Sequence, residues 1–304
     1  MDERGLLREI EPVAGELLNR HLGVAKEWFP HEMVPYSRGK DFESGKPWSE
    51  NDSDFGVGNE AMSDAVRGSL FVNLLTEDNL PYYFRDIDQL FGNDGAYGEW
   101  GRNWTAEEGR HSIVIRDYLT VTRAIDPVDL ERARMQQVRG GQVPAPLDLY
   151  EALAYLSMQE LATRIAHRNT GKLMTDKVGE AIMSRVGNDE NLHYLFYRDL
   201  ATAAIEVDPS NMVIGIERAV RTFAMPGTGI PDFERLSREI ARLGVYDLLI
   251  HHDQILVPVV LRHWKLADLT GLTAEAERAR EALLKRIERI GKVGAKLAAD
   301  RVSA

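Results

Sequence analysis

The chain of 304 residues contains no cysteine. Disulfides, thiolate metal ligands, iron–sulfur clusters and a cysteine nucleophile are therefore excluded, which leaves carboxylate, imidazole and hydroxyl chemistry. Net positive charge is lacking as well, since 37 Lys and Arg residues stand against 48 Asp and Glu residues, a net charge of −11. We expect no nucleic-acid partner, because phosphate binding needs a positive surface.

Long apolar runs are also absent. Residues 245–261 come nearest to the ~20 apolar residues of a membrane span, but His251, His252 and Asp253 interrupt them. The first residues carry acidic side chains and lack the apolar core of a signal peptide. We therefore expect no transmembrane segment and a cytoplasmic location. No stretch resembles a linker, so residues 1–304 are predicted to form a single domain.

Apolar residues recur at helical spacing in most of the chain, whereas the alternation of a strand is hard to find. The predicted helical segments are residues 7–27, 60–90, 104–125, 147–170, 172–206, 211–224, 232–250 and 273–299. Gly, Pro and Asp gather between them at 92–98, 139–146, 208–210 and 225–231. The sequence predicts an all-α fold.

Four of these helices carry a glutamate in the middle of the face that should be most apolar. These glutamates are Glu77, Glu108, Glu160 and Glu190. An unpaired carboxylate buried in a core costs several kcal/mol, so four of them in one bundle make sense chiefly around cations.

Two of the glutamates begin a Glu-x-x-His motif, which puts both side chains on one helix face. The motifs are Glu108–His111 and Glu190–His193, and each follows a lone glutamate, Glu77 or Glu160, by 31 or 30 residues. One such motif can arise by chance, but none of the other six histidines has a glutamate three residues before it. The spacing matches the di-iron bundles of ferritin-like proteins, in which two helices give one Glu each and two give Glu-x-x-His.

The sequence thus predicts a ferritin-like di-iron four-helix bundle over about residues 60–206, with flanking helices over about 7–27 and 211–299. The predicted metal ligands are Glu77, Glu108, His111, Glu160, Glu190 and His193. Four carboxylates and two imidazoles suit two oxygen-preferring ions, hence two iron ions, with manganese as a substitute. Pro81 should kink the helix at Glu77, unless that helix ends at Leu80.

The residues around the predicted ligands resemble those of the acyl-[acyl-carrier-protein] desaturases, soluble enzymes of the stearoyl type found in plastids and actinobacteria. The passages that carry the likeness are EDNLPYY at 77–83, WTAEEGRH at 104–111, QELAT at 159–163 with RNTG at 168–171, DENLH at 189–193 and RHWKLADLTGLTAE at 262–275. The resemblance runs from about residue 25 to about residue 290. It implies O2-dependent insertion of a cis double bond into an acyl chain on acyl carrier protein, with electrons from a ferredoxin-type donor.

The resemblance also implies roles for residues near the ligands. Thr163 corresponds to a threonine associated with oxygen activation and proton delivery, although a helix-face threonine can simply bond back to a carbonyl. Trp28 and Trp104 could line a route for electrons or could be plain core residues. Metal-bound histidines usually donate their second ring nitrogen to an acceptor, and Asp189 is the candidate acceptor for His111.

An acidic acyl carrier protein would be repelled by a chain of charge −11, so the resemblance demands a basic surface. Residues 262–296 supply nine Lys and Arg against five Asp and Glu, although a solvated helix with incidental charge would look the same. Glu107 and Arg110 flank the ligands and are expected to form a pair. The chain departs from the plant enzymes at Tyr82–Tyr83, where a small residue is expected. A homodimer is also expected.

Other classes share the bundle. A di-iron hydroxylase or oxidase remains open, as does an acyl-carrier-protein-binding protein without turnover. A ribonucleotide-reductase radical subunit has two Glu-x-x-His motifs but normally begins its ligand set with aspartate, where this chain has Glu77. An iron-storage protein would normally be shorter.

Overall fold

The computed structural model describes residues 2–55, 62–141, 143–225, 227, 230 and 232–302. Within these ranges every regular element is a helix, so the all-α prediction is confirmed. The α-helices are α1 (Glu3–Val24), α2 (Pro30–Met33), α3 (Asp64–Glu77), α4 (Leu80–Phe91), α5 (Gly95–Val121), α6 (Pro127–Gly140), α7 (Leu149–Leu173), α8 (Lys177–Val207), α9 (Pro209–Thr222), α10 (Phe233–Arg242), α11 (Leu248–His251) and α12 (Ala274–Val302). Short 3₁₀ turns η1 (Tyr36–Arg38), η2 (Glu50–Asp52) and η5 (Leu266–Asp268) and a π-helical segment, η4 (His252–His263), complete the set.

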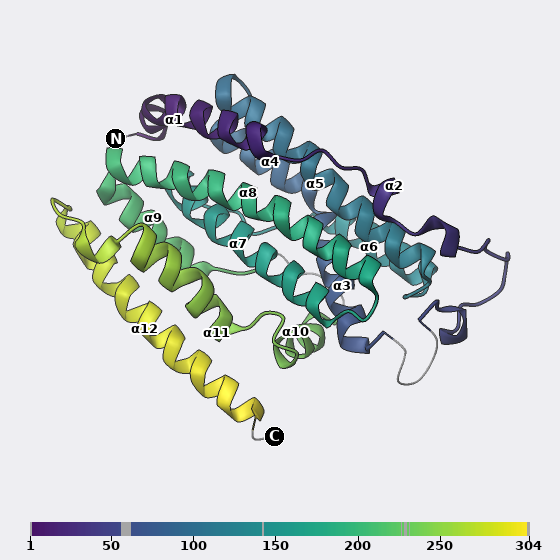
Figure 1. Ribbon diagram of the computed structural model, residues 1–304. Coiled ribbons are helices and arrows are strands. Elements are labelled where there is room, and N and C mark those ends of the chain that lie inside the picture. Colours follow the sequence, from purple (N-terminus) through teal and green to yellow (C-terminus); the bar gives the residue numbers. More distant parts are fainter. Residues whose placement is uncertain are drawn as a thin grey trace.

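A four-helix bundle of α3, α5, α7 and α8 forms the centre of the molecule. The long helices α7 and α8 pack against each other along most of their length, α3 packs on α5 and α7, and α5 packs on α8 (Figure 1). On one side α1 covers α5 and α8, and on the other side α9 lies between α7 and α12. The bundle is thus enclosed by flanking helices, which keeps water from its interior.

Helix starts follow local chemistry. Ser63 accepts a hydrogen bond from the backbone N–H of Val66 at the start of α3, and Asp148 accepts one from Glu151 at the start of α7. Each cap satisfies one backbone N–H group that the first turn of a helix leaves unpaired. These caps fix where the two ligand-bearing helices begin.

The predicted helix 60–90 is two helices, and its first two residues lie outside the described ranges. Helix α3 ends at Glu77 and α4 begins at Leu80. Pro81 occupies the second position of α4, where its missing N–H costs nothing because the first turn has no helical acceptor for it. The expected kinked helix is therefore wrong, and the break falls three residues before the alternative end at Leu80.

Other boundaries differ from the prediction as well. Helix α5 begins at Gly95, inside the stretch 92–98 that was expected to be a loop, and α6 was not predicted at all. The segment 232–250 divides into α10 and α11, and the apolar stretch that follows is π-helical, with the N–H of Trp264 bonded to the carbonyl of Val259. None of the helices in the described ranges is long and apolar enough to cross a membrane.

Candidate metal centre

The six predicted ligands converge in the middle of the bundle. Glu77 comes from the end of α3, Glu108 and His111 from α5, Glu160 from α7, and Glu190 and His193 from α8. None of the six is more than 7% exposed. Their donor atoms form two groups, in each of which all atoms lie within 4.8 Å of one another. One group is Glu77, Glu108, His111 and Glu190, and the other is Glu108, Glu160, Glu190 and His193. Glu108 and Glu190 belong to both groups, so the two groups lie side by side and together would hold two adjacent cations.

Both histidines present the same ring nitrogen to the interior. His111 Nδ1 lies 3.2 Å from Glu108 Oε2 and 3.5 Å from Glu190 Oε1, and His193 Nδ1 lies 2.8 Å from Glu108 Oε1. The opposite nitrogens, Nε2, face carboxylates outside the cluster, those of Asp189 and Glu107. An ionised carboxylate only accepts, so each Nε2 carries a proton, and Nδ1 is the nitrogen that can offer a lone pair to a metal once its own proton is lost.

The short contact between His193 and Glu108 is poorly aligned for a hydrogen bond. Glu108 Oε1 and His193 Nδ1 are 2.8 Å apart, yet both atoms are buried without a hydrogen-bond partner of acceptable geometry. Buried polar atoms are normally satisfied, so two such atoms side by side need a common partner. A cation between them would be that partner, and the observed residues therefore fit a metal.

The charges of the cluster point the same way. Burial and the neighbouring Glu190 raise the pKa of Glu108 and raise that of Glu160 well above its usual range. Burial also raises the pKa of Glu190, but hydrogen bonds from His111 and His167 outweigh it and lower the pKa well below its usual value. Without cations these carboxylates cannot all be ionised together, so those with raised pKa values, Glu108 and Glu160, are the ones that take up protons.

Asp189 lies behind the first imidazole, as predicted. His111 Nε2 is 3.5 Å from Asp189 Oδ2, and the indole N–H of Trp28 donates to the same oxygen at 2.7 Å. Arg185 pairs with the other oxygen of Asp189. Trp28 also stacks on His111 with ring centroids 6.5 Å apart, so it contacts the ligand both directly and through the carboxylate.

Glu107 holds the second imidazole in a similar way. His193 Nε2 lies 2.8 Å from Glu107 Oε2, and the expected Glu107–Arg110 pair is present at 3.7 Å. The third partner of Glu107 is His21 of α1, whose Nε2 lies 3.1 Å from the same oxygen. Burial raises the pKa of Glu107, but hydrogen bonds from His193 and His21 hold it far below its usual range. The prediction missed His21, because nothing in the sequence of α1 marks it as a partner of a residue 86 positions later.

His167 is a second residue that the prediction missed. It is 1% exposed, and its Nε2 lies 3.0 Å from Glu77 Oε1 and 3.6 Å from Glu190 Oε1. Burial lowers its pKa, but Glu190 and Glu77 outweigh burial and raise the pKa to about 9. A signal was available, because Glu160, Thr163 and His167 follow one another at steps of three and four on one face of α7.

Thr163 lies on the face of α7 that is turned toward the cluster. Its Oγ1 is 2.9 Å from the carbonyl of Glu160 and also 2.9 Å from Glu190 Oε2, so its single proton has an acceptor in its own helix and another on a predicted ligand. Trp104 donates its indole N–H to Glu160 Oε1 at 3.2 Å and is therefore more than a packing residue.

An apolar cavity of about 160 Å³ borders the cluster on the α7 side. Thr163 and His167 form its inner wall, and Val72, Phe233 and Val245 are among the apolar side chains that line the rest. A hydrocarbon chain in this cavity would lie beside the buried carboxylates with little water around it.

The bundle and its paired Glu and Glu-x-x-His donors define a protein of the ferritin-like class. The sequence profile of the fatty acid desaturase family matches residues 2–304, and the chain belongs to that family. The predicted resemblance is thereby confirmed.

The relatives agree with this placement. A Mycobacterium tuberculosis protein, DesA1, whose name assigns it provisionally to the acyl-[acyl-carrier-protein] desaturases, is 42% identical over 91% of this chain and 83% of its own length. A chloroplastic stearoyl-[acyl-carrier-protein] 9-desaturase of Arabidopsis thaliana is 31% identical over 72% of this chain and 61% of its own. The crystal structure of M. tuberculosis DesA2, 22% identical, matches with a TM-score of 0.70 over 90% of this chain and 99% of that one, which establishes the shared fold.

Proposed function

We propose that the protein desaturates a fatty acyl chain carried on acyl carrier protein, using O2 and a di-iron centre held by the six converging side chains. The observation that carries the proposal is the pair of buried donor groups that share Glu108 and Glu190, next to an apolar cavity whose lining residues Thr163 and His167 both contact Glu190. Family membership directs this chemistry to an acyl chain. The oxygen-rich donor set favours iron, with manganese as the substitute.

When bound, the two iron ions would supply the redox chemistry with O2. Two electrons from a ferredoxin-type donor and two protons, together with the two hydrogen atoms from the cleaved C–H bonds, reduce O2 to two waters. The protein positions the chain and excludes water. Thr163 holds a proton at Glu190 Oε2, and Asp189 and Glu107 hold the imidazoles of His111 and His193 in the tautomer that leaves Nδ1 free.

The proposed partners are acyl carrier protein, the ferredoxin-type donor and a second copy of the chain, in the cytoplasm. The rival functions differ in their products. Purified iron-loaded protein should be incubated with stearoyl-acyl carrier protein, ferredoxin, its reductase and O2, and the acyl product weighed by mass spectrometry. A loss of two hydrogens supports desaturation. Gain of one oxygen would make the protein a hydroxylase, and an unchanged chain with a loaded metal centre would overturn the enzymatic assignment.

A further inference from the structure

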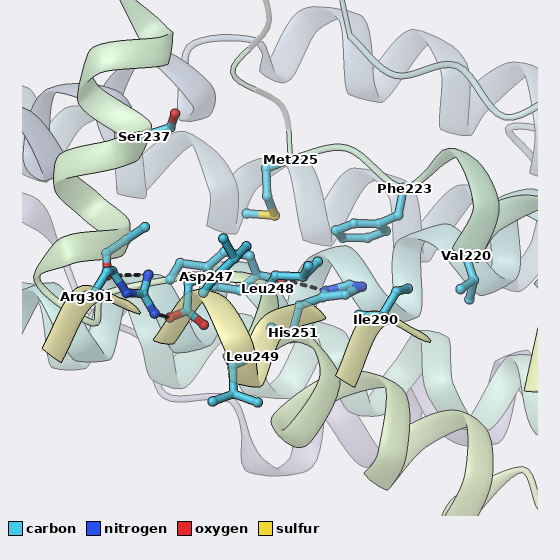
Figure 2. A pocket seen from close by; sticks show the side chains of 14 residues that line it. Val220, Phe223, Met225, Ser237, Asp247, Leu248, Leu249, His251, Ile290 and Arg301 are labelled. Atoms are coloured by element: carbon cyan, nitrogen blue, oxygen red, sulfur yellow. Dashed lines mark hydrogen bonds and ion pairs between the residues drawn. The ribbon is translucent and has the colours of Figure 1, made fainter. Parts of the chain in front are cut away.

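A second apolar cavity lies behind the one that borders the cluster. It has a volume of about 380 Å³ and lies between the end of α9, α10, α11 and the last turns of α12 (Figure 2). Met225, Ser237 and Tyr246 line both cavities. These side chains therefore lie where the second cavity, which is open to solvent, meets the cavity beside Thr163 and His167.

The polar groups that line the second cavity are already paired with one another. Tyr246 Oη lies 2.8 Å from His251 Nδ1, and Arg301 forms an ion pair with Asp247 at the opposite end. Burial and the neighbouring His252 lower the pKa of His251 to about 4, so its imidazole is neutral at pH 7. With these groups satisfied, the remaining walls are apolar side chains such as Phe223, Leu248 and Ile290, shown in Figure 2. Such walls suit the hydrocarbon part of an acyl chain better than the polar prosthetic arm of a carrier protein.

Size favours joint use of the two cavities. Pockets for small ligands usually measure about 300–1,000 Å³. The cavity beside the cluster, about 160 Å³, is too small by this standard for a whole acyl chain, whereas the two together are large enough.

Charge favours the α12 side as the entrance. Residues 285–301 contain six Lys and Arg against two Asp and Glu, a local charge of +4 in a chain of net charge −11. Ion pairs bind Lys285 to Glu281, Lys292 to Glu288 and Arg301 to Asp247. The excess that remains on this part of the helix is Arg286, Arg289 and Lys296 against Asp300. The same turns supply Ile290, Gly294, Leu297 and Arg301 to the cavity wall. An acidic carrier protein would be attracted to the surface where the cavity opens.

We infer that the acyl chain of the carrier-bound substrate enters between α11 and α12, passes through the second cavity, which we call the outer cavity, and reaches the cluster past Met225, Ser237 and Tyr246. The inference rests on the proposed function, because it takes acyl-acyl carrier protein to be the substrate. It adds an entry route and assigns the outer cavity to the part of the chain near the thioester.

The absence of cysteine makes a direct test possible, since a single introduced thiol is unique. Leu297→Cys places it on the cavity wall and Val293→Cys places it one turn earlier on α12, outside the wall. The two side chains are exposed to similar extents, 49% and 41%. The rate of alkylation by a maleimide is measured by mass spectrometry on the full-length, metal-loaded protein, alone, with stearoyl-acyl carrier protein, and with a carrier that has no acyl chain and whose prosthetic arm has its thiol blocked by methylation.

We expect stearoyl-acyl carrier protein at about ten times its dissociation constant to slow labelling at position 297 about tenfold, because occupancy is then about nine tenths. The carrier without an acyl chain should leave the rate at 297 within about twofold of the free rate, and position 293 should respond equally to both carriers. Unchanged labelling at 297, in a protein that still desaturates the substrate, would overturn the entry route and leave the proposed function standing. Equal protection by the two carriers would also overturn it, because the carrier surface and not the acyl chain would then cover the site. A protein that neither binds nor desaturates the acyl carrier protein would instead refute the proposed function.

Discussion

Each inward-facing imidazole of the cluster is held from behind by a carboxylate, and each carboxylate has a further donor. His111 faces Asp189, which accepts from Trp28, and His193 faces Glu107, which His21 also contacts. Such outer partners fix the ring orientation and tautomer of a ligand and commonly change metal affinity by about 10–100-fold.

His21→Phe should therefore weaken iron binding at the His193 side of the cluster by about tenfold or more. His21→Gln, which can still donate to Glu107, should restore part of the loss. Anaerobic titration with Fe(II) measures the affinity directly and does not depend on turnover. His31→Phe, at an exposed histidine of α2, is the matched control and should bind iron as the unaltered chain does. Equal affinities in all variants would show that His21 only fills space beside Trp100.

His251 gives a pH dependence of stability with a definite sign. Its pKa is about 4 in the folded chain and about 6.5 in an unfolded one, so between these values the unfolded state binds more protons. The free energy of unfolding should thus fall as pH drops from about 6.5 to about 4, by up to about 3 kcal/mol from this residue. Urea unfolding across this range should show a shallower decline for His251→Asn. Parallel curves for the two proteins would contradict the buried neutral imidazole.

The metal-site residues differ in how far they could be predicted. The six proposed ligands could be found from sequence because two helices carry Glu-x-x-His and the lone glutamates repeat at matching distance. His167 shares the Glu160 face of α7 and could have been added by the same argument. His21 could not, because its pairing with Glu107 depends on how α1 packs across the bundle, which is a tertiary fact.

At the scale of elements, the break between α3 and α4 places Glu77 at a helix end, and α6 holds that break. Arg134 of α6 donates to both oxygens of Asp78, at 2.7 and 2.9 Å, and Gln137 donates to Asn79 at 3.3 Å. Asp78 and Asn79 are both buried. The helix that was not predicted thus fixes the two residues that follow a proposed ligand.

Arg134→Met should destabilise the fold by about 3 kcal/mol, because it leaves the carboxylate of Asp78 buried without its cation. The stability of Arg134→Lys should lie between that of the unaltered chain and that of Arg134→Met, since a lysine keeps the charge but loses the bidentate contact. Chemical denaturation gives the difference. Arg132→Met is the control on the same helix; Arg132 is 76% exposed, and its pair with Asp129 should contribute less than about 1 kcal/mol. If both Met variants unfold alike, α6 does not hold the break.

Long helices with regular apolar stripes were predicted well, and the failures have local causes. Helix α6 has only Leu130, Ala133 and Gln137 buried, so it lacks the stripe that marks a helix packed on a core. Pro81 was predicted to kink a continuous helix, because its place at the start of a new helix depends on where α3 ends. The π-helical turns of η4 leave no pattern that distinguishes them from α-helix in an apolar stretch.

At the scale of the whole molecule, the flanking helices enclose four carboxylates and three histidines. Because these groups are buried, metal binding is coupled to the release of protons. Ligands must lose their protons before they bind a metal. In the metal-free chain, burial and Glu190 raise the pKa values of Glu108 and Glu160. Burial lowers the pKa values of His111 and His193, but Glu108 and other neighbouring carboxylates outweigh it and raise them.

The apparent iron affinity should consequently rise with pH, by about tenfold per pH unit for each proton released on binding. Anaerobic Fe(II) titrations between about pH 6 and pH 8, with a pH indicator to count protons, test this. Glu160→Gln should release one proton fewer than the unaltered chain. An affinity independent of pH, with no proton release, would mean that the cluster is already ionised and would contradict the raised pKa values.

The central claim is that these six side chains hold two adjacent metal ions. Diffraction from crystals of the iron-loaded protein, recorded on both sides of the iron absorption edge, tests it most directly. The account predicts two anomalous peaks about 3.5–4 Å apart, one among Glu77, Glu108, His111 and Glu190 and the other among Glu108, Glu160, Glu190 and His193. A single peak, or iron bound elsewhere while these side chains stay hydrogen-bonded to one another, would contradict it.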